Sequence, residues 1–322
     1  MNKKRQGACA ALLAVSFLFG SAIAARADYL EGLKAFRAGD MNRAEEEFKY
    51  EVETAPNYDF GWYMLGMISL KKADYPQAEQ HLQKAIELSP NKFSYYNGLA
   101  SLYAAQKENA RAVELLLERQ GLAETGREIL TLNQALGFNS VRLGNHQDAV
   151  VYLEQAKTNP PNLEVFSQLG RSYIILKEYD KAIAALKTAL AVEPDNVSML
   201  QLLGNSIITK AQSVKTDAAK MALYDEVIPY ARKLVLLEGD DYLNHNLLGR
   251  ALFGARRYSD SIASFGKVLE LKPDYCFAYS NIGKVYLTQN QAEIAERNLR
   301  DGLKCDPKNH VTWELLGSTM EK

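Results

Sequence analysis

The feature that most constrains the fold of this 322-residue sequence is a Leu/Ile–Gly/Ala pair that recurs along most of its length. The small residues of these pairs are Ala100 and Gly66, Gly137, Gly170, Gly204, Gly249, Gly283 and Gly317, and Gly32 begins the series without an apolar partner. The successive spacings are 34, 34, 37, 33, 34, 45, 34 and 34 residues. A period of about 20–50 residues is typical of proteins in which each unit packs on its neighbours.

Other residues keep the same register. Twelve residues after most of these positions stands a small residue, and four residues later an apolar one: Ala44 and Phe48, Ala78 and Leu82, Ala112 and Leu116, Ala149 and Leu153, Ala182 and Leu186, Ser261 and Phe265, and Ala295 and Leu299. Prolines stand near the ends of six units, at Pro56, Pro90, Pro161, Pro194, Pro273 and Pro307. Apolar spacings of three, four and seven residues form one face of a helix, and proline ends a helix. Each unit is therefore predicted to be a pair of antiparallel helices.

These residues resemble the tetratricopeptide repeat family. The pattern is carried by Trp62, Leu65, Gly66, Ala78, Leu82, Ala85 and Pro90 in one unit and by Phe166, Leu169, Gly170, Tyr173, Ala182, Leu186, Ala189 and Pro194 in another. The resemblance implies an all-α, right-handed superhelical solenoid over residues 28–322. Its repeats are expected near residues 28–58, 59–92, 93–129, 130–162, 163–196, 197–241, 242–275 and 276–309, with a partial helix at 310–322.

Two repeats depart from the pattern. The third lacks its closing proline and is three residues long through residues 120–127. The sixth is eleven residues longer than 34 and lacks both the small residue and the proline. Its extra length is expected around residues 210–225, between its two helices.

The first 27 residues have the features of a secretory signal peptide. Lys3, Lys4 and Arg5 precede an apolar run over residues 8–20, and A-x-A patterns end at Ala24 and Ala27. We expect cleavage after Ala27. The alternative is an uncleaved membrane anchor, but the run is shorter than the about 20 residues that a spanning helix needs. The protein is therefore expected to be exported, either periplasmic in a Gram-negative bacterium or secreted, without stable membrane insertion.

The composition argues against nucleic-acid binding and catalysis. The whole chain has 38 basic and 39 acidic residues, so it offers no excess of positive charge for a nucleic acid. The histidines are scattered, and neither a P-loop nor a GxSxG or GxGxxG motif is present. His245 stands at the repeat position of Trp62 and is interpreted as a packing residue. We expect no enzymatic activity, no metal and no cofactor.

The resemblance also implies a concave groove lined by the first helix of each repeat. The apolar part is predicted to consist of Tyr29, Leu33, Phe36, Phe60, Tyr63, Met67, Leu70 and Phe138. The polar and cationic part is predicted to consist of Arg171, Asn205, Asn246, Arg250 and Lys284. The N-terminal aromatic residues have an alternative role, which is packing beneath the neighbouring repeat.

The cations suggest the chemistry of a partner. Arginine binds a carboxylate through two parallel hydrogen bonds, so the polar part is expected to bind an acidic segment. Carboxylates of adjacent helices, such as Glu164 or Glu314, are the rival partners for these cations. The clamp with which some members of the family bind terminal carboxylates is not reproduced, because Asn246 and Arg250 stand where it needs Lys and Asn.

A disulfide between Cys276 and Cys305 is the remaining prediction about a site. The two cysteines lie at the start of the first helix and the end of the second helix of repeat eight, and antiparallel packing brings such ends together. Two free thiols are the alternative.

The function expected from the sequence is that of a protein- or peptide-binding scaffold of the bacterial cell envelope, in assembly, secretion or polysaccharide export. A structural subunit that oligomerises without a groove ligand is the alternative.

Overall fold

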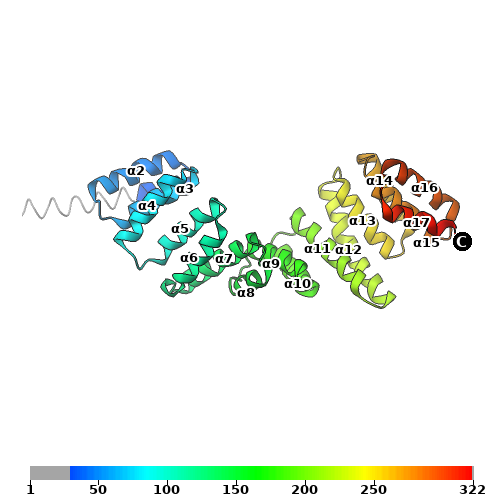
Figure 1. Ribbon diagram of the computed structural model, residues 1–322, viewed down its shortest axis with the longest axis horizontal. Coiled ribbons are helices and arrows are strands. Elements are labelled where there is room, and N and C mark those ends of the chain that lie inside the picture. The colour runs from blue at the N-terminus through cyan, green and yellow to red at the C-terminus, as the bar shows by residue number, and fades with distance from the viewer. Residues whose placement is uncertain (1–29, 321–322) are drawn as a thin grey trace, which may run out of the picture. The chain divides into compact units, whose positions relative to one another are not determined.

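The computed structural model describes residues 30–320, which form helices joined by short turns (Figure 1). Residues 30–38 are helical. The following helices are α2 (Met41–Thr54), α3 (Asp59–Lys71), α4 (Tyr75–Leu88), α5 (Phe93–Ala105), α6 (Asn109–Glu118), η1 (Gln120–Leu122), α7 (Gly126–Arg142), α8 (His146–Gln155), α9 (Leu163–Ile175), α10 (Tyr179–Val192), α11 (Val197–Ser213), α12 (Asp217–Leu237), α13 (Tyr242–Gly254), α14 (Tyr258–Leu271), α15 (Phe277–Thr288), α16 (Ala292–Cys305) and α17 (His310–Met320). Residues 30–320 contain no strand, so the predicted all-α fold is confirmed. The predicted signal peptide lies outside the described residues.

The chain divides into two compact units, one ending at Ala156 and the other beginning at Lys157. Within the first unit, α3 pairs with α4, α5 with α6 and α7 with α8. Within the second, the pairs are α9 with α10, α11 with α12, α13 with α14, and α15 with α16, and α17 follows the last pair. Each compact unit thus consists of successive helix pairs. The right-handed superhelix expected over the whole array stays a prediction.

Most of the recurring glycines are sites of close approach between the two helices of a pair, whereas Gly204 lies against Leu247 of the next pair. A Cβ atom at Gly66 would lie 2.6 Å from Cγ of Leu82, and one at Gly170 would lie 2.7 Å from Cδ2 of Leu186. Carbon atoms in ordinary contact are about 3.5–4.0 Å apart, so no side chain fits at these positions. The small residue twelve positions after the glycine is fully buried in the same interface, as at Ala78 and Ala182. The recurring spacing of small and apolar residues in the sequence therefore arises from the packing of one helix on another.

One hydrogen bond recurs at the start of the first helices. Nε1 of Trp62 donates to the carbonyl of Pro56 at 2.8 Å, and Nε1 of Trp313 donates to the carbonyl of Pro307 at 2.9 Å. Nε2 of His245 lies 2.9 Å from the carbonyl of Gly239, also six residues earlier. This contact ties the helix to the preceding turn and agrees with the packing role interpreted for His245.

The sixth repeat differs from the expectation. Its extra residues do not form a loop between the helices but lengthen both of them. Helices α11 and α12 have 17 and 21 residues, whereas α3 and α4 have 13 and 14, and the difference accounts for the eleven additional residues. Only residues 214–216 separate α11 from α12.

The N-terminal half of α12, which includes its additional turns, is attached to the pair that follows. Arg256 and Arg257 form ion pairs with Asp217 and Asp225, with N–O distances of 3.0 and 2.9 Å. The ring of Tyr224 covers Gly254 so closely that a Cβ atom there would lie 2.1 Å from Cγ of the tyrosine. A glycine at the end of α13 is therefore required for the longer α12 to pack.

Candidate functional site

The predicted apolar groove residues take part in packing within the first unit. Leu33, Phe36, Phe60 and Tyr63 are half-buried against the core of the first two helix pairs, and Tyr63 also lies against the next core cluster along the chain. The ring centroids of Phe60 and Tyr63 are 5.9 Å apart, and those of Tyr63 and Tyr95 are 5.0 Å apart. Burial raises the pKa of the Tyr63 phenol. These contacts are the ones expected if the N-terminal aromatic residues pack between repeats, which was the alternative to groove binding.

The other members of this predicted part are placed as follows. Met67 and Leu70 lie half-buried against the second core cluster, and Phe138 is half-buried on α7. Tyr29 lies outside the described residues. Peptide binding by this apolar set stays a prediction.

The predicted polar residues lie on successive first helices of the second unit. Arg171 on α9 donates from Nη2 to Oγ of Ser198 on α11 at 3.3 Å. Arg250 on α13 donates from Nη1 to Oδ1 of Asn205 on α11 at 3.2 Å. Each arginine thus contacts the first helix of an adjacent pair through a neutral side chain.

The remaining two polar residues have different surroundings. Nζ of Lys284 on α15 lies 5.5 Å from the centroid of the Phe253 ring, within the range of a cation–π contact. Asn246 is 9% exposed, and its Oδ1 is buried without a hydrogen-bond partner in the described part of the chain. The neighbouring amides are paired, since Nε2 of Gln201 donates to Oδ1 of Asn244 at 3.0 Å.

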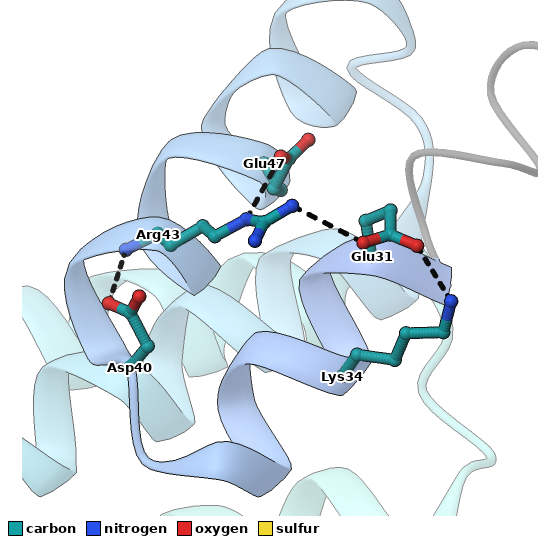
Figure 2. Close-up of polar contacts among 5 residues, drawn as sticks. All are labelled: Glu31, Lys34, Asp40, Arg43 and Glu47. Carbon is teal, nitrogen blue, oxygen red and sulfur yellow. Dashed lines mark hydrogen bonds and ion pairs between the residues drawn. The ribbon is translucent and has the colours of Figure 1, made fainter.

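The three groove cations lack the carboxylates that the sequence offered as rival partners. Among residues 30–320, Arg171, Arg250 and Lys284 form no ion pair, with Glu164 and Glu314 or with any other carboxylate. The first helix pair provides a contrast, because several of its charges are paired (Figure 2). Glu31 accepts from Lys34 at 2.7 Å and from Arg43 at 3.3 Å, Arg43 lies 4.0 Å from Glu47, and Asp40 caps α2 through the backbone N–H of Arg43.

A cavity of about 190 Å³ lies beside two of these cations. It is lined by side chains from five helices of the second unit: Ile208, Gln212, Tyr224, Arg250, Phe253, Phe265, Asn281 and Lys284. Burial raises the pKa of the Tyr224 phenol, and the charge of Arg250 opposes part of that rise. The phenol is therefore neutral near pH 7 and presents an apolar ring with one hydroxyl to the cavity.

Sequence reasoning identified Arg250 and Lys284 but not Gln212 and Tyr224. Gln212 belongs to the added part of α11, for which the only signal was the length of the insertion, since eleven residues correspond to about three helical turns. Tyr224 stands 25 residues before Gly249, as Tyr75, Tyr179 and Tyr258 stand before the next small residue of the series, and this register could have found it.

The two cysteines of repeat eight form a disulfide in the structure. Cys276 directly precedes α15, Cys305 ends α16, and their Cα atoms are 5.5 Å apart. The bond joins the start of one helix to the end of its antiparallel partner. It therefore fixes the last complete helix pair at one end.

Metal ions and membranes were the other conceivable ligands of the described residues. Within residues 30–320, no group of three or more His, Cys, Asp or Glu side chains is arranged to hold a metal ion. None of the helices in this range is long and apolar enough to cross a membrane.

Comparison with known proteins gives two kinds of match. Residues 60–92 and 141–205 match family models described as tetratricopeptide repeat. The chain is 21% identical to the BBSome complex member BBS4 homolog of Drosophila melanogaster, over 85% of this chain and 56% of that protein. It is also 21% identical to Hsp70-Hsp90 organizing protein 3 of Arabidopsis thaliana, over 76% of this chain and 42% of that protein. The chain thus spans about half the length of these relatives.

Solved structures of MamA are also similar. The MamA structure from Desulfovibrio magneticus RS-1 is 17% identical, with a TM-score of 0.48 over 56% of this chain and 97% of that one. A second MamA structure, titled MSR-1, is 23% identical with the same TM-score and the same coverage of both chains.

Proteins built from tetratricopeptide repeats generally mediate protein–protein interactions, because stacked repeats present an extended concave surface. Here the matched segments contain the pairs α3–α4 and α9–α10, in which Gly66 lies against Leu82 and Gly170 against Leu186 in the predicted register. The chain therefore carries tetratricopeptide repeats, folded as a helical repeat solenoid.

Proposed function

We propose that this protein is an exported, non-enzymatic scaffold of the bacterial cell envelope that binds an acidic segment of a partner protein. The observation that carries the proposal is the set of three cations, Arg171, Arg250 and Lys284, at one repeat position of α9, α13 and α15, without an ion pair among the described residues. Their present partners are neutral hydrogen-bond acceptors and an aromatic ring.

An acidic ligand gains more from these cations than a neutral one. A carboxylate can accept two parallel hydrogen bonds from a guanidinium group and adds the attraction of opposite charges. The present acceptors, Ser198 and Asn205, are neutral side chains in exposed contacts that supply neither, so exchanging them for a carboxylate costs little. Charge complementarity of this kind also raises the rate of association at low salt.

Export is proposed from the N-terminal sequence, with cleavage after Ala27. The disulfide between Cys276 and Cys305 supports an oxidising compartment, where such bonds persist. A role in envelope assembly, secretion or polysaccharide export belongs to the same proposal.

The test is affinity capture from a periplasmic extract with the mature protein, followed by binding measurements with the captured partner. We expect the double variant Arg171→Glu and Arg250→Glu to bind at least about tenfold more weakly at low salt and to lose much of the salt dependence of binding. Helicity and thermal unfolding should be unchanged, because both side chains are on the surface of their helices.

The matched control is Lys267→Glu with Lys304→Glu, which changes the net charge equally on two exposed second-helix positions of the same unit. This control should retain the affinity. Equal affinities of the groove variant and the unmodified protein would contradict the acidic-segment proposal. Capture of only further copies of this chain would favour the oligomerising subunit instead.

A further inference from the structure

The cavity beside Arg250 and Lys284 combines an apolar floor with a charged rim. Phe265 is 1% exposed and Ile208 is 1% exposed, and together with Phe253 they form the apolar part of the lining. Arg250 and Lys284 stand at the same repeat position on α13 and α15, so they contribute to the rim from two neighbouring helices.

The size of the cavity restricts its occupant. Sites for small molecules and cofactors usually enclose about 300–1,000 Å³, whereas this cavity encloses about 190 Å³. The space is suited to one large side chain rather than to a whole ligand. Its aromatic and aliphatic lining favours an apolar side chain, since a charged one would lose its hydration there.

The charged rim of the cavity determines which residues of the partner can flank that apolar side chain. Neither cation at the rim has a carboxylate partner within the described residues, and the eight residues that line the cavity include no acid. Arg250 donates to Asn205 on α11, and Arg171 on α9, the next first helix, donates to Ser198 of the same α11. A partner chain that enters the cavity thus meets polar groups of this protein before and after it.

We propose that this cavity takes one large apolar side chain, such as Phe or Leu, from an internal extended segment of a partner in which acidic residues stand on both sides of it. This proposal rests on the acidic-segment binding proposed above and adds the anchor and its flanking pattern. Polar groups on both sides of the cavity favour a segment that passes through over one that ends there.

The insertion of the sixth repeat contributes one wall of this site. Gln212 lies in the part of α11 that exceeds the 13 residues of an ordinary first helix. Tyr224 stands where Tyr75 and Tyr258 begin α4 and α14, and its ring is held in place by its fit over Gly254. The ion pairs of Arg256 with Asp217 and of Arg257 with Asp225 hold the turns of α12 on both sides of Tyr224. A repeat of 34 residues would lack Gln212 in the lining.

Binding of capped synthetic peptides tests the proposal. Four fluorescent acidic peptides are compared. Three have blocked termini: the first has Phe between two acidic pairs, the second has Ala at that place, and the third has Phe outside an unbroken acidic block. The fourth resembles the first but ends in a free C-terminus directly after Phe. We expect the first to bind at least about tenfold more tightly than the second, equivalent to about 1.4 kcal/mol, and more tightly than the other two.

Variants locate the anchor. Gln212→Trp fills the cavity from an exposed position of α11, and Tyr224→Ala opens its wall, so both should remove the preference for Phe over Ala. Lys304→Gln on α16 is the control and should keep it. Gln212→Trp removes no core contact, and it therefore remains informative if Tyr224→Ala fails to fold.

Each outcome bears on one proposal or on both. Equal binding of the Phe and Ala peptides, a preference that survives Gln212→Trp, or tighter binding of the free C-terminus overturns the anchor but leaves the acidic-segment proposal standing. Failure of all four acidic peptides to bind overturns both. Loss of the Phe preference in Gln212→Trp, and in Tyr224→Ala if that variant folds, supports the anchor when Lys304→Gln keeps the preference and the Ala peptide still binds.

Discussion

Gly170→Ala tests whether close approach of paired helices is the reason for the recurring glycine. A Cβ atom at this position would lie 2.7 Å from Cδ2, 2.8 Å from Cγ and 3.4 Å from Cδ1 of Leu186, which is fully buried. Relief of these contacts requires a movement of about 1 Å, because ordinary carbon contacts are about 3.5–4.0 Å. The fixed interface of α9 and α10 leaves the leucine little room to move.

Two effects of opposite sign decide the magnitude. Overpacking a core costs about 1–3 kcal/mol, whereas replacing Gly by Ala in a helix gains about 0.5–1 kcal/mol. We therefore expect Gly170→Ala to lower the free energy of unfolding by about 0.5–2 kcal/mol. Gly266→Ala on α14 is the matched control in the same unit, since a Cβ atom there meets nothing within 4 Å. That variant should be stabilised by about 0.5–1 kcal/mol.

A double-mutant cycle measures the contact itself. Leu186→Ala should cost about 2–5 kcal/mol by leaving a cavity. In that background Gly170→Ala should be neutral or stabilising, because the added methyl group enters the vacated space. The coupling energy between the two sites should then be about 0.5–3 kcal/mol, measured by urea unfolding followed by circular dichroism. Additive effects, or stabilisation by Gly170→Ala alone equal to that of Gly266→Ala, would refute the explanation.

Two further predictions concern titration and redox state. Burial lowers the pKa of the His81 imidazole below its usual 6.5, so the unfolded chain binds a proton more readily than the folded chain and stability is lost as the pH falls through 6.5. His81→Gln should reduce this loss in urea unfolding between about pH 7.5 and 5.5, and an unchanged pH dependence would contradict the prediction. The disulfide of Cys276 and Cys305 should leave no reactive thiol in the denatured mature protein, and its reduction should cost about 3–4 kcal/mol of stability on the chain-entropy account. Two reactive thiols before reduction would contradict it.

The helix pairs were predictable because the residues that specify them recur locally. Each helix pair is described by three residues: a glycine or alanine, a small residue twelve positions later, and an apolar residue four positions after that. Because this spacing recurs along the chain, the pattern is readily recognised. Gly170, Ala182 and Leu186 take the predicted places in the structure, and the latter two are fully buried. The prolines mark helix ends for a local reason as well, since proline removes a backbone donor.

The helix lengths of the sixth repeat could not be predicted from this local spacing. Its insertion has no counterpart in the other repeats, so the sequence offered only a length and we expected a connection between the helices. The structure instead continues both helices, because Asp217 and Asp225 pair with arginines of the following turn and Tyr224 fits over Gly254. These contacts join residues that are about 30–40 positions apart, which no local pattern reveals.

The sequence by itself determined the class of fold and the register of the helix pairs, because these depend on spacing within one repeat. Only the tertiary structure decided what each predicted groove residue contacts. Tyr63 packs on Tyr95, whereas Arg250 reaches Asn205 across 45 residues and remains without a carboxylate partner in the described part of the chain. The physical reason is that burial, pairing of charge and the shape of a cavity depend on several helices at once, and their side chains meet only after the repeats have stacked.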